Sequence, residues 1–387
     1  MADKGFSVTI VSDGNSTQPQ KETIDRIPII RVEHLALALL TRKRELLEII
    51  SNTTPDILIW YGTPLSAIYL TKLKSLQKPL IWDIDTGLNT FKIFRQVSLR
   101  EILDLDHNLL MDQTMTAVCP RFVIRSTANS SLVSKIIVSG QYLKTALCRI
   151  GVDPTKIEVI PLTMGPRKLD LPTNSEETVE TKNEFGNETK FTVTYFGSPC
   201  TLRGTDTLIF GFRKILEKHR NTRLVILSRR SLRMPSHERD HLSIEEIYLK
   251  RLVHRLNLEY DVEIISGTLD KSTLEQYVLA SDVIALPFKL IFSEPPLSVL
   301  EAMSYGKAVV TTNLGILPEI IGNDRGILTA PGDPKSLAEA ILFLEENQQE
   351  SVILGTNAKR FVTGLVDWDC VALQLIRLLH EVIERSG

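Results

Sequence analysis

The sequence lacks the features that mark disulfide-rich, zinc-binding, nucleic-acid-binding and membrane-spanning proteins. Its four cysteines stand apart without CxxC spacing, so neither a disulfide framework nor structural zinc is expected. With 45 Lys and Arg against 47 Asp and Glu, it lacks the basic excess that nucleic-acid binding requires. No apolar run approaches the ~18–20 residues that span a bilayer. The length of 387 residues predicts two domains, and a content of 43% hydrophobic and 24% charged residues is typical of an α/β protein. Together with these absences, the composition predicts a cytoplasmic protein.

Two series of short apolar segments alternate with helical patterns along the chain. The predicted strands of the first half are Phe6–Ser12, Ile27–Val32, Asp56–Trp60, Pro79–Asp83, Lys135–Ser139 and Ile157–Pro161. Those of the second half are Phe191–Phe196, Arg223–Leu227, Asp261–Ile265, Asp282–Leu286 and Lys307–Thr312. Helices are predicted over Tyr142–Ile150, Thr205–Lys218, Leu297–Ser304, from Asp333 onward, and over a C-terminal stretch with Leu375, Leu378 and Val382 on one face. The unalternating strands and intervening helices indicate a doubly wound parallel sheet in each half.

A polar segment without periodicity separates the two series, and we predict a linker there over residues 166–189. The domains are predicted as 1–165 and 190–364, with a C-terminal helix over 365–387. Two sheets of this kind imply a cleft at the carboxyl ends of their strands, where α/β proteins bind ligands.

The segment YFGSPCTLRG, residues 195–204, joins a predicted strand to a predicted helix. The strand ends at Gly197, and Ser198, Arg203 and Gly204 lie in the loop before the helix. Backbone amides at such a helix start, together with the Arg203 guanidinium, can hold a diphosphate. A plain turn with a solvated arginine is the alternative explanation.

A second segment places two carboxylates around the start of a helix. Glu294 precedes that helix, whose positive end favours an anion, and Glu301 lies on it, where a carboxylate can accept two ribose hydroxyls. The two prolines after Glu294 have no N–H, so the amides of Leu297 and Ser298 are left to bind an anion. A helix-start carboxylate beside an exposed glutamate is the simpler explanation of this pair taken alone.

Taken in order, the motifs of the second half resemble those of glycosyltransferase family 4, the retaining transferases of the GT-B fold. That family reads a glycine, a basic loop ending in Lys-Gly, a glutamate, then "lEAMa.GkPVv", "pEi" and "Gllv". The matching positions are Gly197, Arg203-Gly204, Glu294, Leu300–Met303, Gly306–Val310, Pro318–Ile320 and Gly326–Leu328. The resemblance extends from Phe191 to about Phe343 and is weaker over the first half.

The resemblance implies a nucleotide-diphosphate sugar donor on the second domain and a sugar, glycan or lipid-linked acceptor on the first. By position, Arg203 corresponds to the diphosphate-binding lysine, Glu301 to the ribose-binding glutamate, and Glu294 to the glutamate that faces the donor sugar. It also implies a C-terminal helix that crosses back to the first domain. Neither a cofactor nor a metal is implied; Asp83-Ile84-Asp85 has the spacing of a metal loop but aligns with a strand end.

The sequence departs from the family at several positions. Six residues, where the family has seven, separate Glu294 from Glu301, and Ser198 stands where an arginine usually follows the glycine. Asp85, which we count with Arg203 and Glu294 as a catalytic candidate, stands where a first-domain histidine usually meets the sugar. The sequence also begins at the family's second strand, so we expect the first strand, its glycine-rich loop and the first helix to be absent.

Retaining glycosyl transfer is the function we favour, and these departures keep two others open. A catalytically silent GT-B chain would bind a nucleotide sugar or partner an active subunit. A GT-B epimerase or phosphorylase would act on related substrates, although nothing marks the lysine that a phosphorylase needs for pyridoxal phosphate. A peripheral membrane contact over Phe91–Met115 is less favoured than a solvated helix there.

Overall fold

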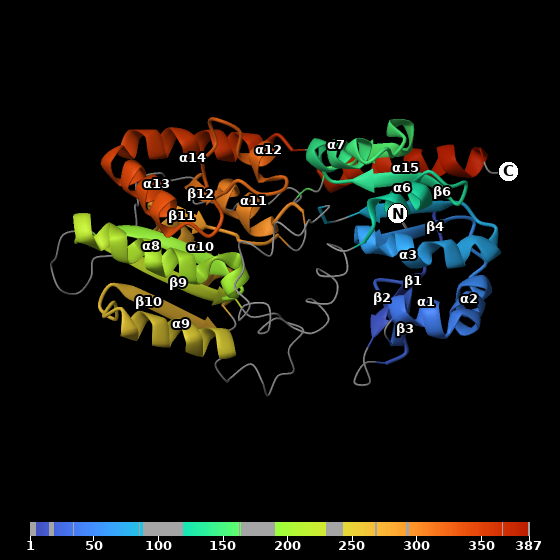
Figure 1. Ribbon diagram of the computed structural model, residues 1–387, viewed down its shortest axis with the longest axis horizontal. Coiled ribbons are helices and arrows are strands. Elements are labelled where there is room, and N and C mark those ends of the chain that lie inside the picture. Colours follow the sequence, from blue (N-terminus) through green and yellow to red (C-terminus); the bar gives the residue numbers. More distant parts are fainter. Residues whose placement is uncertain are drawn as a thin grey trace. The chain divides into compact units, whose positions relative to one another are not determined.

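The computed structural model describes residues 5–14, 19–33, 35–84, 86–87, 119–161, 163, 190–229, 243–267, 269–291, 294–365 and 367–385. They form two compact units (Figure 1). The first takes the described residues up to 163 together with 367–385, and the second takes those from 190 to 365. Among the helices described, none is long and apolar enough to cross a membrane.

The second unit is built on a six-stranded sheet in the order β10-β9-β8-β11-β12-β13, and every neighbouring pair is parallel. The strands are β8 Phe191–Gly197, β9 Thr222–Arg229, β10 Val262–Gly267, β11 Val283–Leu286, β12 Ala308–Thr312 and β13 Ile327–Thr329. Every residue of β8, β11 and β12 is buried. The unalternating apolar runs of the sequence therefore belong to strands that are covered on both faces.

The helices of this unit are α8 Thr205–Lys218, α9 Ile244–Arg255, α10 Lys271–Leu279, α11 Leu297–Ser304, α12 Leu317–Ile321, α13 Pro334–Glu346 and α14 Gln348–Thr363. Helices α9, α10 and α13 begin after residues whose side chains cap them. Asp270 accepts a hydrogen bond from the Thr273 amide at the start of α10, and Asp333 accepts one from the Lys335 amide at the start of α13. The predicted bounds of α8 and α11 are confirmed, whereas the short edge strand β13 is not among the predicted strands.

The first unit contains two sheets where the sequence predicts one. One has the order β1-β3-β2, and the other has the order β4-β5-β6-β7. The strands are β1 Ile10–Gly14, β2 Lys21–Ile24, β3 Ile27–Glu33, β4 Leu58–Gly62, β5 Leu80–Ile84, β6 Val133–Val138 and β7 Ile157–Val159; the helices are α1 Leu35–Thr41, α2 Lys43–Asn52, α3 Ala67–Leu70, α6 Arg121–Ala128 and α7 Gln141–Arg149. β1 and β4 are both edge strands, and no pairing joins them among the strands described.

The hairpin of β2 and β3 is antiparallel and was not predicted. Its turn residues Asp25 and Arg26 both have positive φ, 49° and 68°. Hairpin turns of this shape usually carry Asn-Gly or Asp-Gly, and β2 is too polar to show a strand pattern. Local sequence signals therefore do not predict this hairpin.

The helix α15, Trp368–Glu384, packs on the first unit, as the resemblance implies for a C-terminal helix that crosses back. Its Leu378, Leu379 and Val382 form a cluster with Ile81 of β5 and Ile137 of β6. Phe6 joins this cluster, and its ring centroid lies 5.5 Å from that of His380. The prediction that a strand starts at Phe6 was wrong, because this side chain packs on α15 and the strand begins only at Ile10.

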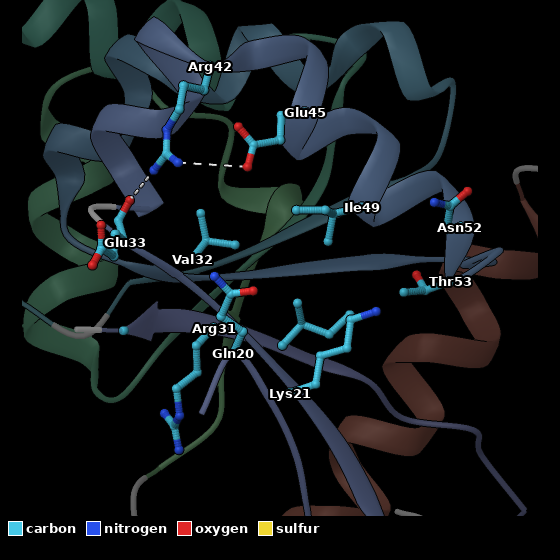
Figure 2. Close-up of a pocket in the computed structure, with 12 residues that line it drawn as sticks. Gln20, Lys21, Arg31, Val32, Glu33, Arg42, Glu45, Ile49, Asn52 and Thr53 are labelled. Atoms are coloured by element: carbon cyan, nitrogen blue, oxygen red, sulfur yellow. Dashed lines mark hydrogen bonds and ion pairs between the residues drawn. The ribbon is translucent and has the colours of Figure 1, made fainter. Parts of the chain in front are cut away.

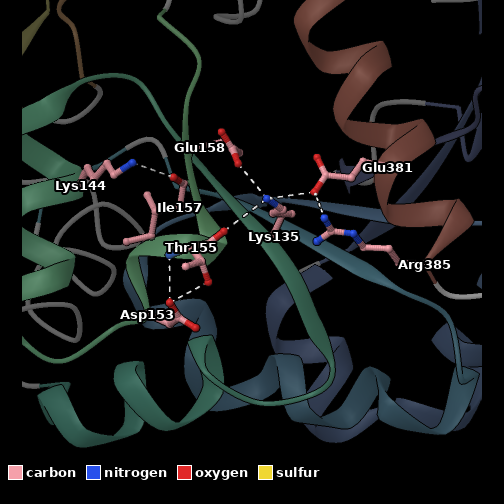
Figure 3. Close-up of polar contacts among 8 residues, drawn as sticks. All are labelled: Lys135, Lys144, Asp153, Thr155, Ile157, Glu158, Glu381 and Arg385. Atoms are coloured by element: carbon pink, nitrogen blue, oxygen red, sulfur yellow. Dashed lines mark hydrogen bonds and ion pairs between the residues drawn. The ribbon is translucent and has the colours of Figure 1, made fainter.

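A buried lysine joins α15 to the sheet beneath it (Figure 3). Lys135 of β6 places its ammonium group 2.8 Å from a carboxylate oxygen of Glu158 on β7 and 3.4 Å from one of Glu381 on α15. Arg385 pairs with the same oxygen of Glu381 at 3.0 Å. Charge pairing thus adds to apolar packing at this contact.

Candidate donor site

The candidate donor-binding residues of the second half gather at the carboxyl edge of its six-stranded sheet. Gly197 is in register with Ser228, and Ser228 with Ser266, so β8, β9 and β10 reach this edge together. β11 pairs with β8, and α11 follows β11 along the chain. This is the edge at which ligands bind in open parallel sheets.

A tyrosine and two glycines shape the turn after β8. The buried Tyr195 hydroxyl donates a hydrogen bond to the Ser198 carbonyl oxygen at 2.5 Å. Burial raises the pKa of Tyr195 well above its usual range, so the phenol stays a neutral donor. Gly197 and Gly204 have φ angles of 140° and 79°, which glycine alone adopts readily. At Gly204 a Cβ atom would also stand 1.8 Å from the Pro287 carbonyl oxygen.

Arg203 ends the 3-10 turn Thr201–Arg203 and is half-buried. One guanidinium nitrogen lies 3.5 Å from the point that a Cβ atom on Gly197 would occupy. The guanidinium carbon lies 6.0 Å from the centre of the Phe288 ring. Within the described part of the chain, no ion pair or hydrogen bond engages this guanidinium. The structure therefore holds this charge beside Gly197.

Sequence reasoning missed two charged residues that underlie this turn. Asp206, in the first turn of α8, and Lys289, after β11, form a buried ion pair with 2.8 Å between Nζ and Oδ2. The available signal was a lysine within the apolar run LPFKLI, residues 286–291, because a lysine at such a position requires a buried partner.

Glu294 is buried, and its carboxylate lies against the loop that follows β12. A Cβ atom at Gly315 would stand 2.3 Å from Glu294 Oε1, so the missing side chain makes room for the carboxylate. Gly315 also has a φ of 51°, in the left-handed region. Glu294 is therefore placed by a glycine that the sequence analysis did not single out.

The first turns of α11 carry the remaining donor candidates. Leu297 is exposed, and Ser298 has a buried hydroxyl oxygen that makes no hydrogen bond with the described residues. Glu301 is buried, so the alternative of an exposed glutamate is wrong. The helix thus presents two backbone amides and one unsatisfied hydroxyl at its N-terminus, with a carboxylate one turn further on.

One catalytic candidate and one lysine of the family motif remain to be placed. Asp85 lies outside the described residues. Lys307, in the Gly-Lys motif before β12, donates to the carbonyl oxygens of Leu279 and Ser281 at 2.6 and 2.8 Å, so it closes the end of α10. In the part of the chain that the structure describes, no group of His, Cys, Asp and Glu side chains could hold a metal ion.

A cavity of about 440 Å³ lies in the first unit, between the β2–β3 hairpin and α2 (Figure 2). Ile30, Val32 and Ile49 are among its lining residues. Arg42 points toward β3, where it donates to the Glu33 carbonyl oxygen at 2.6 Å, and it lies 3.7 Å from the Glu45 carboxylate. Because this cation is already engaged by protein groups, we assign no ligand to the cavity.

Residues 177–361 match the family model described as glycosyl transferases group 1. The second half of this chain is thus similar to the glycosyl transferases group 1 domain. The match is to the group as a whole, and assignment to family 4 stays a prediction. The matched residues include the whole of the candidate donor site, from Gly197 to Gly315.

Two curated relatives of this domain are transferases by name. The chain is 26% identical over 256 residues to an uncharacterized glycosyltransferase of Methanocaldococcus jannaschii, covering 65% of this chain and 61% of the relative. It is 27% identical over 138 residues to the MMP alpha-(1->4)-mannosyltransferase of Mycolicibacterium hassiacum, covering 35% of this chain and 33% of the relative. The chain thus spans less than two thirds of the length of these relatives.

Solved structures show the fold of both halves. Sucrose-phosphate synthase from Thermosynechococcus elongatus matches with a TM-score of 0.71 at 17% identity, over 99% of this chain and 91% of that one. HepE of Anabaena, solved in complex with UDP-glucose, matches with a TM-score of 0.64 at 18% identity, over 92% of this chain and 86% of that one. The predicted GT-B fold is confirmed.

Proposed function

We propose that the chain is a retaining glycosyltransferase that moves a sugar from a nucleotide-diphosphate donor to an acceptor on the first half. The observation that carries the proposal is the Arg203 guanidinium. It is half-buried beside Gly197 at the ligand-binding edge of the sheet, and no described protein group pairs with it. A half-buried cation with which no described group forms a hydrogen bond or ion pair favours an anionic ligand such as a diphosphate.

In the proposed reaction, the bond between the anomeric carbon and the diphosphate oxygen breaks. The acceptor hydroxyl oxygen bonds to the same carbon on the same face, and its proton passes to the leaving phosphate oxygen. No side-chain nucleophile is required. Arg203 and the amides of Leu297 and Ser298 would stabilise the charge that develops on the departing diphosphate. Orientation of the two substrates would supply the rest of the barrier reduction.

The two glutamates would divide the donor between them. Glu301, on α11, would accept hydrogen bonds from two ribose hydroxyls, and Glu294, held against Gly315, would face the sugar. Because HepE, of the same fold, has been solved with UDP-glucose, UDP is our first binding probe and UDP-glucose our first donor.

The diphosphate role is tested with Arg203→Ala and titration calorimetry of UDP. A charged hydrogen bond contributes about 1.5–3 kcal/mol, so UDP affinity should fall about ten- to a hundredfold. Arg213→Ala is the matched control, because Arg213 is an exposed arginine on α8. Unchanged UDP affinity in Arg203→Ala would overturn the assignment.

The glutamate roles are tested with Glu301→Gln and Glu294→Gln, which keep the volume of these buried side chains. Glu301→Gln should raise the dissociation constant of UDP, whereas Glu294→Gln should leave it nearly unchanged and lower the turnover of UDP-glucose. If the two variants change binding and turnover alike, the division of roles is wrong, and the six-residue spacing is the first place to look.

Ser198 favours one other candidate, a GT-B chain that binds a nucleotide sugar without turning it over. A serine supplies no charge where the related transferases place a second cation, so the leaving diphosphate would be less well stabilised. Release of UDP from UDP-glucose by the purified full chain, in the presence of acceptor mixtures, distinguishes the two. Tight UDP binding with no release from any tested donor would favour the silent chain.

A further inference from the structure

A buried ion pair joins the two segments that carry opposite parts of the candidate donor site. Lys289 Nζ lies 2.8 Å from Asp206 Oδ2, and the two side chains are only 7% and 12% exposed. Asp206 lies three residues after Arg203 in the first turn of α8, and Lys289 lies five residues before Glu294. The pair thus connects the Arg203 turn to the loop that leads to Glu294.

Backbone contacts hold the same two segments together. The amides of Lys289 and Leu290 both donate to the Leu202 carbonyl oxygen, at 2.9 and 3.0 Å. Gly204 lies so close to Pro287 that a Cβ atom would stand 1.8 Å from the Pro287 carbonyl oxygen. The two segments therefore form one connected body, and the ion pair lies in its interior.

Stability alone is a weak reason for an ion pair at this depth, because desolvation of two charges offsets most of their attraction. A lysine is also disfavoured near a helix N-terminus, where the helix dipole is positive. The position is better explained by what Asp206 would do without its partner. Without the lysine, the negative charge of Asp206, three residues from Arg203, would attract the guanidinium and repel a diphosphate.

On the basis of the proposed donor site, we propose that Lys289 is a positioning residue for nucleoside-diphosphate binding. By holding the Asp206 carboxylate, Lys289 keeps the Arg203 guanidinium available to the diphosphate. It also joins the Arg203 turn to the segment that carries Glu294. Its own charge is matched by Asp206, so it does not replace the second diphosphate cation that Ser198 lacks.

The two charges of the pair then have opposite effects on diphosphate binding. Lys289→Met removes the ammonium group from the Asp206 carboxylate, so the affinity for UDP should fall about tenfold or more. Affinity for uridine, which has no phosphate, should change less than about twofold in the same variant. Asp206→Asn removes the negative charge beside Lys289 and should bind UDP at least as tightly as the unchanged protein. The double variant has no charge at either position and should bind UDP within about threefold of the unchanged protein.

A merely structural pair would give a different result, since both single variants would then weaken UDP and uridine binding alike. Titration calorimetry on the full chain separates the two cases. Lys307→Met is the matched control, because Lys307 is a lysine of the same unit engaged by carbonyl groups before β12, at the opposite edge of the sheet. It should lower thermal stability and leave UDP affinity unchanged.

Equal losses in the two single variants, or no loss in Lys289→Met, would overturn the proposal. If Lys289→Met does not fold, the comparison of Asp206→Asn with the double variant decides, because weaker UDP binding by Asp206→Asn contradicts the proposed charge effect. Failure of the donor site itself is distinguishable. In that case the unchanged protein binds no UDP, whereas a wrong role for Lys289 leaves UDP binding sensitive to Arg203→Ala alone.

Discussion

Gly204→Ala is the sharpest perturbation of the donor turn, because it adds one methyl group at a position of known geometry. An alanine there would have to adopt a φ of 79°. Its Cβ atom would stand 1.8 Å from the Pro287 carbonyl oxygen, whereas ordinary contacts begin at 3.4 Å. The difference, 3.4 − 1.8 = 1.6 Å, is the distance by which the turn and the loop after β11 must separate.

That separation has a cost in stability and a cost in binding. The left-handed conformation costs an alanine about 1–2 kcal/mol, and the forced backbone shift adds about 1–3 kcal/mol, so the free energy of unfolding should fall by about 2–5 kcal/mol. The shift also strains the hydrogen bond from the Lys289 amide to the Leu202 carbonyl oxygen and moves Arg203. Because misplacement by about 1 Å can cost a hundredfold in rate, the transfer rate of the folded variant should fall about a hundredfold.

Gly306→Ala separates the cost of the left-handed conformation from the cost of the steric clash. Gly306 has a φ of 74°, and the nearest atom to an added Cβ is Lys359 Cδ at 3.4 Å, so the conformational cost is matched and the clash is absent. Gly306→Ala should lower the free energy of unfolding by only about 1–2 kcal/mol and leave UDP affinity unchanged. Urea denaturation and calorimetry measure both quantities. Equal stability losses in the two variants, with UDP bound normally by both, would refute the reasoning.

Two further predictions concern other parts of the molecule. Leu379→Ala should lower the free energy of unfolding by about 2–5 kcal/mol, and Leu373→Ala should lower it by less than about 1 kcal/mol. The reason is that Leu379 is 1% exposed, whereas Leu373, on the same helix, is 44% exposed. Equal losses for the two variants in urea denaturation would contradict the packing of α15. Burial raises the pKa of Glu345 above its ordinary 4.5, so its contribution to stability is present at low pH and is lost as pH rises from 4.5 through the folded-state pKa. Glu345→Gln should remove that loss, while Glu346→Gln, which removes only the smaller repulsion from the exposed neighbour, should reduce it less. Parallel stability–pH profiles for Glu345→Gln and the unchanged protein would show that the Glu345 carboxyl does not titrate as expected.

Much of the second unit follows from local sequence signals. The bounds of α8 and α11 were predicted because an apolar stripe, a glycine before the first helix and prolines before the second all act within one or two turns. The strands were predicted because a buried parallel strand requires apolar side chains on both faces. Through the family resemblance, the ordered motifs predict Arg203, Glu294 and Glu301 as parts of one donor site.

The tertiary structure alone decided which distant residues meet. Lys289 and Asp206 are 83 residues apart in the chain, and their pairing leaves no local pattern. Gly315 makes room for Glu294 from the loop after a different strand, and Phe6 packs on a helix at the other end of the chain. Periodicity records the burial of a residue, which is a property of its own segment. A contact between two segments depends on how the whole chain packs. A lysine in an apolar run therefore predicts that a buried partner exists, but it does not predict which residue that partner is.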